Sequence, residues 1–140
     1  MKTKFSASDF ADVVLKKIDP PNCDLTLQLE PIVSNNGYAK AVWEIDERFN
    51  NGIGVTMGGF LSAATDTMMA YAIASLLNPD QTFVSIDLHT TFHRPVLART
   101  AIVEAKVERI GKKIAYLTGE IFQDDKKCCS SVSSVMILEK

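Results

Sequence analysis

Hydrophobic and polar residues alternate with a period of two along six segments of the chain, a pattern that predicts β-strands. In DLTLQLE, residues 24–30, three leucines alternate strictly with polar residues. In TFVSIDLHTTF, residues 82–92, the alternation puts Val84, Ile86 and Leu88 on one face and Ser85, Asp87 and His89 on the other. The six predicted strands are 24–30, 38–45, 82–92, 100–110, 114–122 and a last one from Cys128 to about Leu138.

Two other segments have helical patterns. The first is capped by Ser8, runs to about Lys17 and is ended by Pro20-Pro21. The second runs from Gly58-Gly59 to about Leu77, and Asn78-Pro79-Asp80 ends it. This second helix is apolar on nearly every side, so it must be buried on nearly every side. Its large or apolar residues are Phe60, Leu61, Ala63, Ala64, Met68, Met69, Tyr71 and Ile73.

The order of the predicted elements is α-β-β-α-β-β-β-β, and most strands are joined by short turns such as SNNG at 34–37. Short turns favour an antiparallel sheet over a doubly wound parallel one. One curved antiparallel sheet of about six strands around one central helix would bury that helix. The sequence therefore predicts an α+β fold, and its 140 residues predict a single domain spanning 1–140.

Composition and charge exclude several classes of function. With 46% hydrophobic residues, 23% charged residues and a net charge of −2, the chain resembles an ordinary globular protein. It offers no basic surface for nucleic acid or for an anionic membrane. The apolar run at 68–77 is too short to cross a bilayer, and the N-terminus lacks the apolar stretch of a signal peptide. We expect a cytoplasmic protein without nucleic-acid or membrane partners.

Cysteine and histidine positions argue against a metal site or a disulfide. Cys128 and Cys129 are adjacent, a spacing that suits neither a disulfide nor zinc, and Cys23 is distant in sequence. His89 and His93 share a face of a strand, but nothing completes a metal site around them. We expect three reduced thiols, no metal and no cofactor.

Asp66 is the first candidate for chemistry, since it is the only charged residue between Arg48 and Asp80. A buried carboxylate needs a hydrogen-bonding partner, a raised pKa or a wet pocket. One interpretation is a structural aspartate that bonds the backbone or the hydroxyls of Thr65 and Thr67. The other is a catalytic acid or base.

Two further features could act with Asp66. Gly58-Gly59 begins the helix, so its N–H groups lack intrahelical partners and could polarise a substrate carbonyl, although tight helix–sheet packing would also favour glycine. Asp66 lies about 12 Å of helical rise beyond Gly58, so the acid and the glycine would have to act across two subunits or on a long substrate. Ser85 could hold a water molecule or simply face solvent.

NGIGVTMGGFLSAATDTMMAYAIAS followed by VSIDLHTTFHRP resembles the hotdog-fold acyl-CoA thioesterases, and specifically the phenylacetate-pathway branch related to 4-hydroxybenzoyl-CoA thioesterases. The resemblance covers roughly Phe49 to Pro95. It implies a long central helix wrapped by an antiparallel sheet. It also implies homodimers that pair sheets edge to edge, with active sites at the dimer interface. We expect a homodimer or a dimer of dimers, two states that the sequence does not distinguish.

The resemblance also implies roles for individual residues. Asn51 corresponds to the asparagine that positions the thioester, and Gly58 to the glycine whose N–H polarises the thioester carbonyl. Asp66 corresponds to the catalytic carboxylate, which acts as general base or nucleophile, and Ser85 to the serine that orients the attacking water. In a dimer, Asp66 of one subunit would act on a thioester held by Gly58 of the other.

Coenzyme A would be held by residues around this site. The resemblance implies contacts from Gly59 and Met57, from Arg94, and from the turn Gly111-Lys112-Lys113 near the nucleotide, although a plain solvated hairpin is the stronger interpretation of that turn. Met57 departs from the family pattern, which has histidine there. That change removes a polar contact and makes the pocket more apolar.

The leading hypothesis is an acyl-CoA thioesterase that needs no cofactor, because coenzyme A is part of its substrate. The second hypothesis is a non-catalytic acyl-CoA or acyl-carrier binding protein of the same fold, suggested by Met57. The third is an enoyl-CoA hydratase or dehydratase, which would use a histidine beside the acid. Neither His89 nor His93 lies at the helix start, so this hypothesis ranks last.

Overall fold

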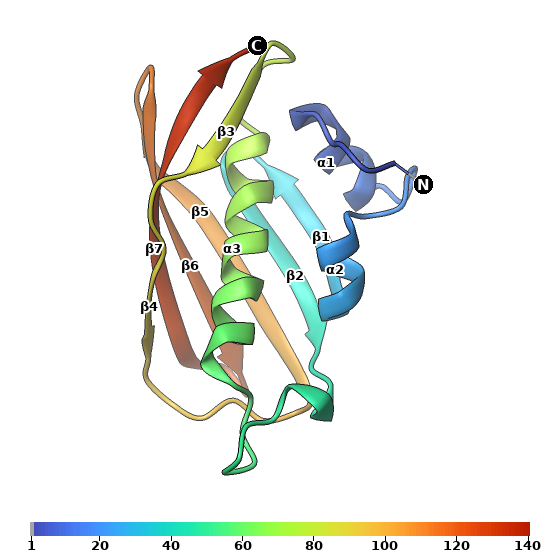
Figure 1. Cartoon of the computed structure of the whole chain (residues 1–140), viewed down its shortest axis with the longest axis vertical. Coiled ribbons are helices and arrows are strands. Elements are labelled where there is room, and N and C mark those ends of the chain that lie inside the picture. The colour runs from blue at the N-terminus through green and yellow to red at the C-terminus, as the bar shows by residue number, and fades with distance from the viewer. Residues whose placement is uncertain (1) are drawn as a thin grey trace.

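One long helix lies in the hollow of a curved antiparallel sheet in the computed structural model, which describes residues 2–140 (Figure 1). The helices are α1 (Ala7–Val14), α2 (Asn22–Leu27), the 3-10 turn η1 (Glu47–Phe49) and the central α3 (Gly58–Ala74). The strands are β1 (Leu29–Asn35), β2 (Tyr38–Glu44), β3 (Gln81–Ser85), β4 (His89–Phe92), β5 (Thr100–Ile110), β6 (Ile114–Gln123) and β7 (Lys126–Glu139). This is the predicted α+β architecture.

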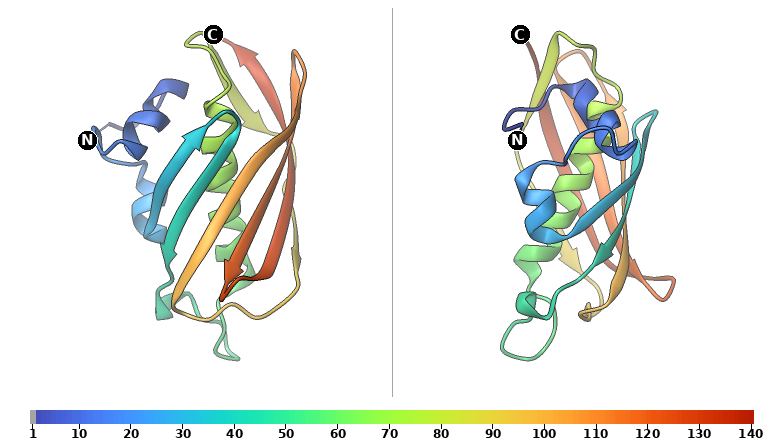
Figure 2. Two further views of the ribbon diagram at one scale, coloured as in Figure 1. Left: turned by 180° about the vertical axis from the view of Figure 1, so that it is seen from behind. Right: turned by 90° about the vertical axis from the view of Figure 1, so that its right-hand side faces the viewer.

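The strand order is β1-β2-β5-β6-β7-β3, and β4 also pairs with β7. β3 and β4 therefore share one position at the edge of the sheet, and the seven strands fill six positions. Helix α3 packs on the concave face, with α1 and α2 beside it over β1. Seen from behind, the convex face of the sheet carries no helix of the part described (Figure 2).

Small side chains line the concave face where α3 packs. Ala105 of β5 and Ala115 of β6 are almost completely buried. At Gly119 a Cβ atom would lie 3.1 Å from the Cβ atom of Thr65, so α3 comes as close to β6 as a backbone without a side chain allows. The same face also carries Ala39, Ala41 and Ala101.

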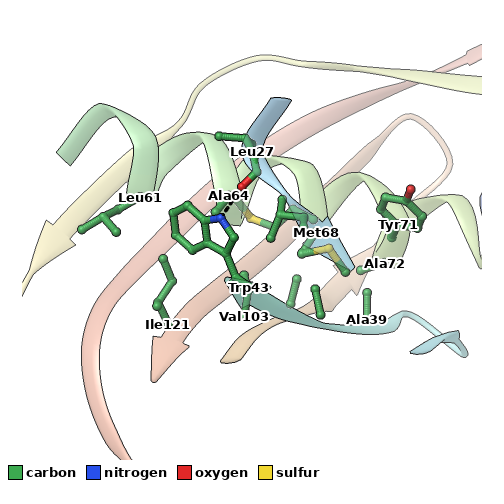
Figure 3. Packing of buried hydrophobic residues seen from close by; sticks show 14 of the residues in the cluster. Leu27, Ala39, Trp43, Leu61, Ala64, Met68, Tyr71, Ala72, Val103 and Ile121 are labelled. Atoms are coloured by element: carbon green, nitrogen blue, oxygen red, sulfur yellow. Dashed lines mark hydrogen bonds between the residues drawn. The ribbon is translucent and has the colours of Figure 1, made fainter. Parts of the chain in front are cut away.

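Larger side chains pack between α3, the sheet and α2 (Figure 3). Trp43 of β2 is completely buried and donates a hydrogen bond from Nε1 to the carbonyl oxygen of Leu27 at 2.6 Å, which satisfies the indole in the core. Met68 and Ile73 of α3 are also completely buried. The apolar character of α3 on nearly every side is thus explained by contacts from the sheet, α1 and α2.

The predicted hairpin at 34–37 is present. Asn36 and Gly37 both have positive φ, at 51° and 76°. A two-residue turn with both central residues in this region matches the right-handed twist of the flanking strands. The predicted helix at 58–77 and the strands at 38–45, 100–110, 114–122 and 128–138 are confirmed to within three residues at each end.

The prediction of a strand over 24–30 was wrong. Residues 22–27 form α2 instead, and Gln28 ends it in the left-handed conformation with φ 65°. Two tertiary contacts override the alternating pattern: the bond from Trp43 to the Leu27 carbonyl, and one from the Tyr71 hydroxyl to the buried Asp24 carboxylate at 2.5 Å. β1 is consequently shifted to Leu29–Asn35.

The first helix also differs from the prediction. α1 begins at Ala7 and ends at Val14, and its N-cap is Ser6, not Ser8. Asp9 at the third helical position accepts the Ser6 N–H at 2.7 Å, completing a capping box. Local hydrogen bonding at Ser6 therefore fixes where the helix starts.

The strand predicted over 82–92 is interrupted. Ser85 pairs with Val135 and His89 pairs with Val132. Between these two pairs the β3/β4 edge advances by four residues, whereas β7 advances by three. The extra residue is a β-bulge, which reverses the alternation beyond it. Ser85 and Thr90 therefore both share a face with buried residues of β7, whereas a continuous strand would have placed them on opposite faces.

Asp87 holds the bulge against β7. Its carboxylate accepts a hydrogen bond from the N–H of Ser134 at 2.7 Å, and its carbonyl oxygen accepts one from the Ser133 hydroxyl at 2.7 Å. These bonds replace the ladder bonds that the bulge removes.

None of the helices within residues 2–140 has both the length and the apolar character that a membrane span requires.

Candidate functional site

A hollow of about 370 Å³ lies beside the N-terminal end of α3. The loop before α3 and the loop after β4 come together there, at one end of the sheet (Figure 1). The loop that precedes α3 is tied to the loop that follows β4, because the Thr56 N–H donates to the Val96 carbonyl oxygen at 2.9 Å. The residues that line the hollow are Asn51, Val55, Thr56, Gly58, Leu61, Phe92, His93, Arg94, Pro95 and Val96. Three predicted site residues, Asn51, Gly58 and Arg94, thus meet in one place.

Asn51 organises the loop that forms one wall of the hollow. Its Oδ1 accepts hydrogen bonds from the N–H groups of Ile53 at 3.0 Å and Val55 at 3.3 Å. Its own N–H donates to the Val55 carbonyl oxygen at 2.7 Å. Since the side-chain oxygen is used by the loop, the Nδ2 amide is the group of Asn51 that remains to donate to a ligand.

Gly58 is the first residue of α3, and Met57 is its N-cap. The N–H groups of Phe60 and Leu61 both donate to the Met57 carbonyl oxygen, whereas those of Gly58 and Gly59 precede the first helical bond. The ring of Phe49 stacks on that of Phe60 with centroids 4.1 Å apart, which fixes the start of the helix. The helix therefore presents the free N–H group of Gly58 at the hollow.

The glycine at position 58 leaves room for the ring of Phe92. A Cβ atom there would lie 2.7 Å from Cζ of Phe92, the β4 residue that lies over the helix start. Met57 and Gly59 are exposed and do not line the hollow. Met57 is 46% exposed, so this residue lies at the surface of the subunit.

Asp66 is half-buried, and no hydrogen bond or ion pair to its carboxylate is formed within residues 2–140. Burial raises the pKa of Asp66, and burial is the only cause of that shift. A carboxylate that is desolvated but unpaired holds its proton more tightly and is a stronger base than an exposed one. The structural interpretation, in which Thr65 and Thr67 bond Asp66, does not hold: Thr65 bonds to Ser62 and Ser131, and Thr67 to the Ala63 carbonyl oxygen.

Asp66 lies along the same edge of the sheet as Ser85. The Gly58 turn of α3 packs on Phe92, and the next turn packs on Thr90 through a hydrogen bond from Ser62 at 2.8 Å. One further turn, about 6 Å on, brings Asp66 level with the bulge between Thr90 and Ser85. Ser85 is the last residue of β3 and is exposed on the concave side, since it pairs with the inward-facing Val135.

Arg94 also lines a second hollow that adjoins the first. This one, of about 410 Å³, carries three basic residues, Arg94, Arg99 and Lys126, of which Arg99 forms an ion pair with Asp124 at 2.7 Å. The predicted Gly111-Lys112-Lys113 turn joins β5 to β6 at the other end of the sheet (Figure 1). Within one subunit, the structure brings Arg94 to the site and leaves the turn away from it.

Three residues of this region carry no signal in the sequence. Phe92 covers Gly58, Asp87 fixes the bulge, and Thr56 lines the hollow. The Thr56 hydroxyl is the one buried side-chain polar atom in residues 2–140 without a hydrogen-bonding partner. Their positions depend on the bulge and on the packing of two loops, neither of which follows from local periodicity.

Comparison with known proteins supports the fold. A putative thioesterase from Ralstonia eutropha described as related to phenylacetic acid degradation is 23% identical, with a TM-score of 0.85 over 91% of this chain and 98% of its own. The PaaI protein of the E. coli phenylacetic acid degradation operon is 21% identical, with a TM-score of 0.81 over 96% of each chain. A Haemophilus influenzae thioesterase is 22% identical, with a TM-score of 0.81 over 99% of this chain and 94% of its own.

No curated protein matches the chain. A family model does match: that of the Thioesterase superfamily aligns with residues 53–130, which is more than half of the chain and contains Gly58, Asp66, Ser85 and Arg94. Together with the helix wrapped in its antiparallel sheet, this match shows that the chain belongs to the thioesterase superfamily and has the hotdog fold.

Proposed function

We propose that this protein is an acyl-CoA thioesterase, which hydrolyses a coenzyme A thioester to the free acid and coenzyme A. The observation that carries the proposal is Asp66, a half-buried carboxylate with a raised pKa and no partner in the structure described. An unpaired buried carboxylate costs stability, and a functional site is the usual place for such a cost.

The proposed reaction uses two groups of α3. The N–H of Gly58 donates to the thioester carbonyl oxygen and stabilises the negative charge that develops there. Asp66 takes a proton from a water molecule whose oxygen attacks the carbonyl carbon. Asn51 holds the thioester through its Nδ2 amide, and Ser85 contacts the water from β3. A thioester needs no further activation, so we expect neither a metal nor a cofactor.

The coenzyme A moiety is proposed to lie against Arg94. The second hollow adjoins the first and offers Arg94 and Lys126, which form no ion pair within residues 2–140, for the phosphates; guanidinium groups bind phosphates well. The alternative site, at Lys112 and Lys113, lies at the far end of the same subunit. It could contribute only from another copy of the chain.

A homodimer is proposed to form through the β3/β4 edge. This edge is open in the structure described, and it exposes Ile86 at 53% and Phe92 at 54%. The opposite edge, β1, is blunted by Pro31 and by a register shift beside it, features that discourage pairing with another strand. Pairing through β3/β4 would place Asp66 of one subunit near Gly58 of the other, which removes the separation of about 12 Å along one helix.

The dimers are proposed to pair through the convex face of the sheet. Val84, Met136 and Ile114 form one row across β3, β7 and β6, and each is more than a third exposed. Tyr116 and Leu138 extend this row into an apolar patch. Apolar patches on sheet faces are typical of contacts between copies.

A second function, binding of an acyl-CoA or acyl-carrier thioester without hydrolysis, is favoured by Met57. This side chain takes the place of a histidine and supplies no polar contact to the thioester. Calorimetry with a coenzyme A thioester separates the two functions: saturable heat without release of free thiol supports binding alone.

Replacing Asp66 by asparagine should lower kcat by at least about a hundredfold, because the amide cannot accept the proton. Release of free thiol from a panel of aromatic and aliphatic acyl-CoAs measures this. Since burial raises the folded-state pKa, the charged carboxylate destabilises the fold above the pKa of the unfolded chain. Asp66→Asn should therefore raise Tm at pH 7, with the difference shrinking toward pH 3.5. Equal kcat for the wild-type protein and Asp66→Asn would refute the role of Asp66 as the base.

Gly58→Pro should abolish activity while Gly58→Ala retains most of it. Proline is tolerated at the first helical position, and the extended φ and ψ of Met57 suit a following proline, but proline removes the N–H. Both variants place a Cβ against Phe92, so their difference isolates the N–H donor. A loss of about a hundredfold in kcat is expected for proline relative to alanine. Matching rates for the two would show that the N–H is not used.

Arg94→Ala and Lys126→Ala should each raise KM for acyl-CoA several-fold with little change in kcat, because they remove contacts to phosphates remote from the thioester. The matched pair Lys112→Ala and Lys113→Ala tests the other end of the sheet. A rise in KM confined to the lysine pair would place the nucleotide at the turn and overturn the assignment to Arg94.

Ile86→Lys and Met136→Lys should each halve the mass in solution, but only Ile86→Lys should abolish activity, since only the β3/β4 edge brings two active-site halves together. Light scattering during gel filtration gives the mass, and the thiol assay gives the activity. Ile32→Lys on β1 is the matched control, because Ile32 is also exposed on an edge strand. Full activity of an Ile86→Lys variant whose mass is halved would rule out a shared site.

A further inference from the structure

Four hydroxyl groups connect α3 to β4 and β7 in an unbroken chain. The Ser62 hydroxyl donates to Thr90 Oγ1 at 2.8 Å. Thr90 Oγ1 lies 3.0 Å from Ser131 Oγ, which lies 2.7 Å from Thr65 Oγ1. Thr65 in turn donates to the carbonyl oxygen of Ser62 at 3.0 Å, which closes the chain on the helix turn where it began.

The direction of every bond in this chain follows from counting hydrogens, since each hydroxyl has only one to donate. A carbonyl oxygen can only accept, so Thr65 gives its hydrogen to the helix backbone. Ser131 must then donate to Thr65, and Thr90 must donate to Ser131. Thr90 can therefore only accept from Ser62, and the whole chain points away from Ser62.

Ser62 is left with a fixed polarity. Its single hydrogen is directed at Thr90, and its lone pairs receive no hydrogen bond from residues 2–140. The Ser62 side chain is only half-buried, whereas Thr65 and Ser131 are almost completely buried. Toward solvent, Ser62 is therefore a hydrogen-bond acceptor held in one orientation, in the way that a carbonyl group would be.

The position of Ser62 makes this acceptor relevant to the reaction. It lies four residues after Gly58 and four before Asp66, on the helix stripe that runs along β4. Side chains four residues apart on a helix have Cβ atoms about 6 Å apart. A single water molecule can span that interval between the Ser62 hydroxyl and the Asp66 carboxylate.

We propose that Ser62 orients the attacking water, an inference that rests on the thioesterase function proposed above. The water donates one hydrogen to Asp66 and the other to Ser62 Oγ, so that its lone pair faces the thioester carbon. As the carbon–oxygen bond forms, Asp66 takes the proton and the carbonyl electron pair moves to oxygen. The intermediate then expels the coenzyme A thiolate, which is protonated from Asp66 or solvent.

Three variants test this role through the split between kcat and KM. Ser62→Ala removes the acceptor and should lower kcat about 10- to 100-fold with KM within about twofold of wild type. Ser62→Thr keeps the hydroxyl and should restore most of kcat. Thr90→Val leaves Ser62 in place but frees its hydrogen to point at Asp66, so kcat should again fall about tenfold or more.

Thr67→Val is the matched control. Thr67 is another hydroxyl of α3, adjacent to Asp66, but it bonds only to the Ala63 carbonyl oxygen at 2.8 Å. Its variant should keep wild-type kcat. Melting temperatures of all four variants identify any loss that comes from unfolding, and Ser62→Thr and Thr90→Val remain informative if Ser62→Ala is unstable.

Wild-type kcat in Ser62→Ala would overturn the inference while leaving the thioesterase function intact, provided that Asp66→Asn is inactive. Wild-type kcat in Thr90→Val together with a loss in Ser62→Ala would overturn the fixed polarity of Ser62. Absence of turnover by the wild-type protein on every acyl-CoA would remove the function and this inference with it.

Discussion

The close approach of α3 to the concave face of the sheet is the constraint on which the rest of the structure depends. It is set by side chains that are absent or small, above all Gly119 against Thr65 and the alanines of β2, β5 and β6. Because the helix and the sheet are already in close contact, one added methylene group between them would cause a clash. Every site residue on α3 inherits its position from that contact.

The second determinant is the bulge between β3 and β4. By adding one residue to the edge, it turns both Ser85 and Thr90 to the side of the sheet on which α3 lies. The Asp87 carboxylate holds this irregular backbone by accepting from the N–H of Ser134. As a result, one stripe of α3 faces a polar, partly open edge, while the remaining faces of the helix are packed in apolar surroundings.

Local sequence patterns were sufficient wherever burial follows a simple period. The alternation at 100–110 and the Asn36-Gly37 turn each predict an element that is present, and the apolar character of α3 implies a wrapped helix. The pattern at 24–30 failed because tertiary hydrogen bonds to Asp24 and Leu27 favour a helix there. The bulge at 86–88 could not be predicted, since a single extra residue leaves the sequence alternation unchanged.

The candidate site could be predicted in part. The start of α3 explains why glycine stands at position 58, and the burial of α3 explains why Asp66 is its only charged residue. The roles assigned to Gly58 and Asp66, however, came from the resemblance to a family. The grouping of Asn51, Gly58 and Arg94 around one hollow required the fold. The fixed polarity of Ser62 required the hydrogen-bonding partners of four side chains from three elements, which no spacing in the sequence reveals.

The central claim is that a complete active site combines Gly58 of one subunit with Asp66 of another. Co-expression of two inactive proteins, one carrying Gly58→Pro and the other Asp66→Asn, tests it most directly. Random pairing leaves one intact site in half of the dimers, so the mixture should recover roughly a quarter of the wild-type rate. A mixture of proven heterodimers that stays as inactive as either parent would contradict the claim.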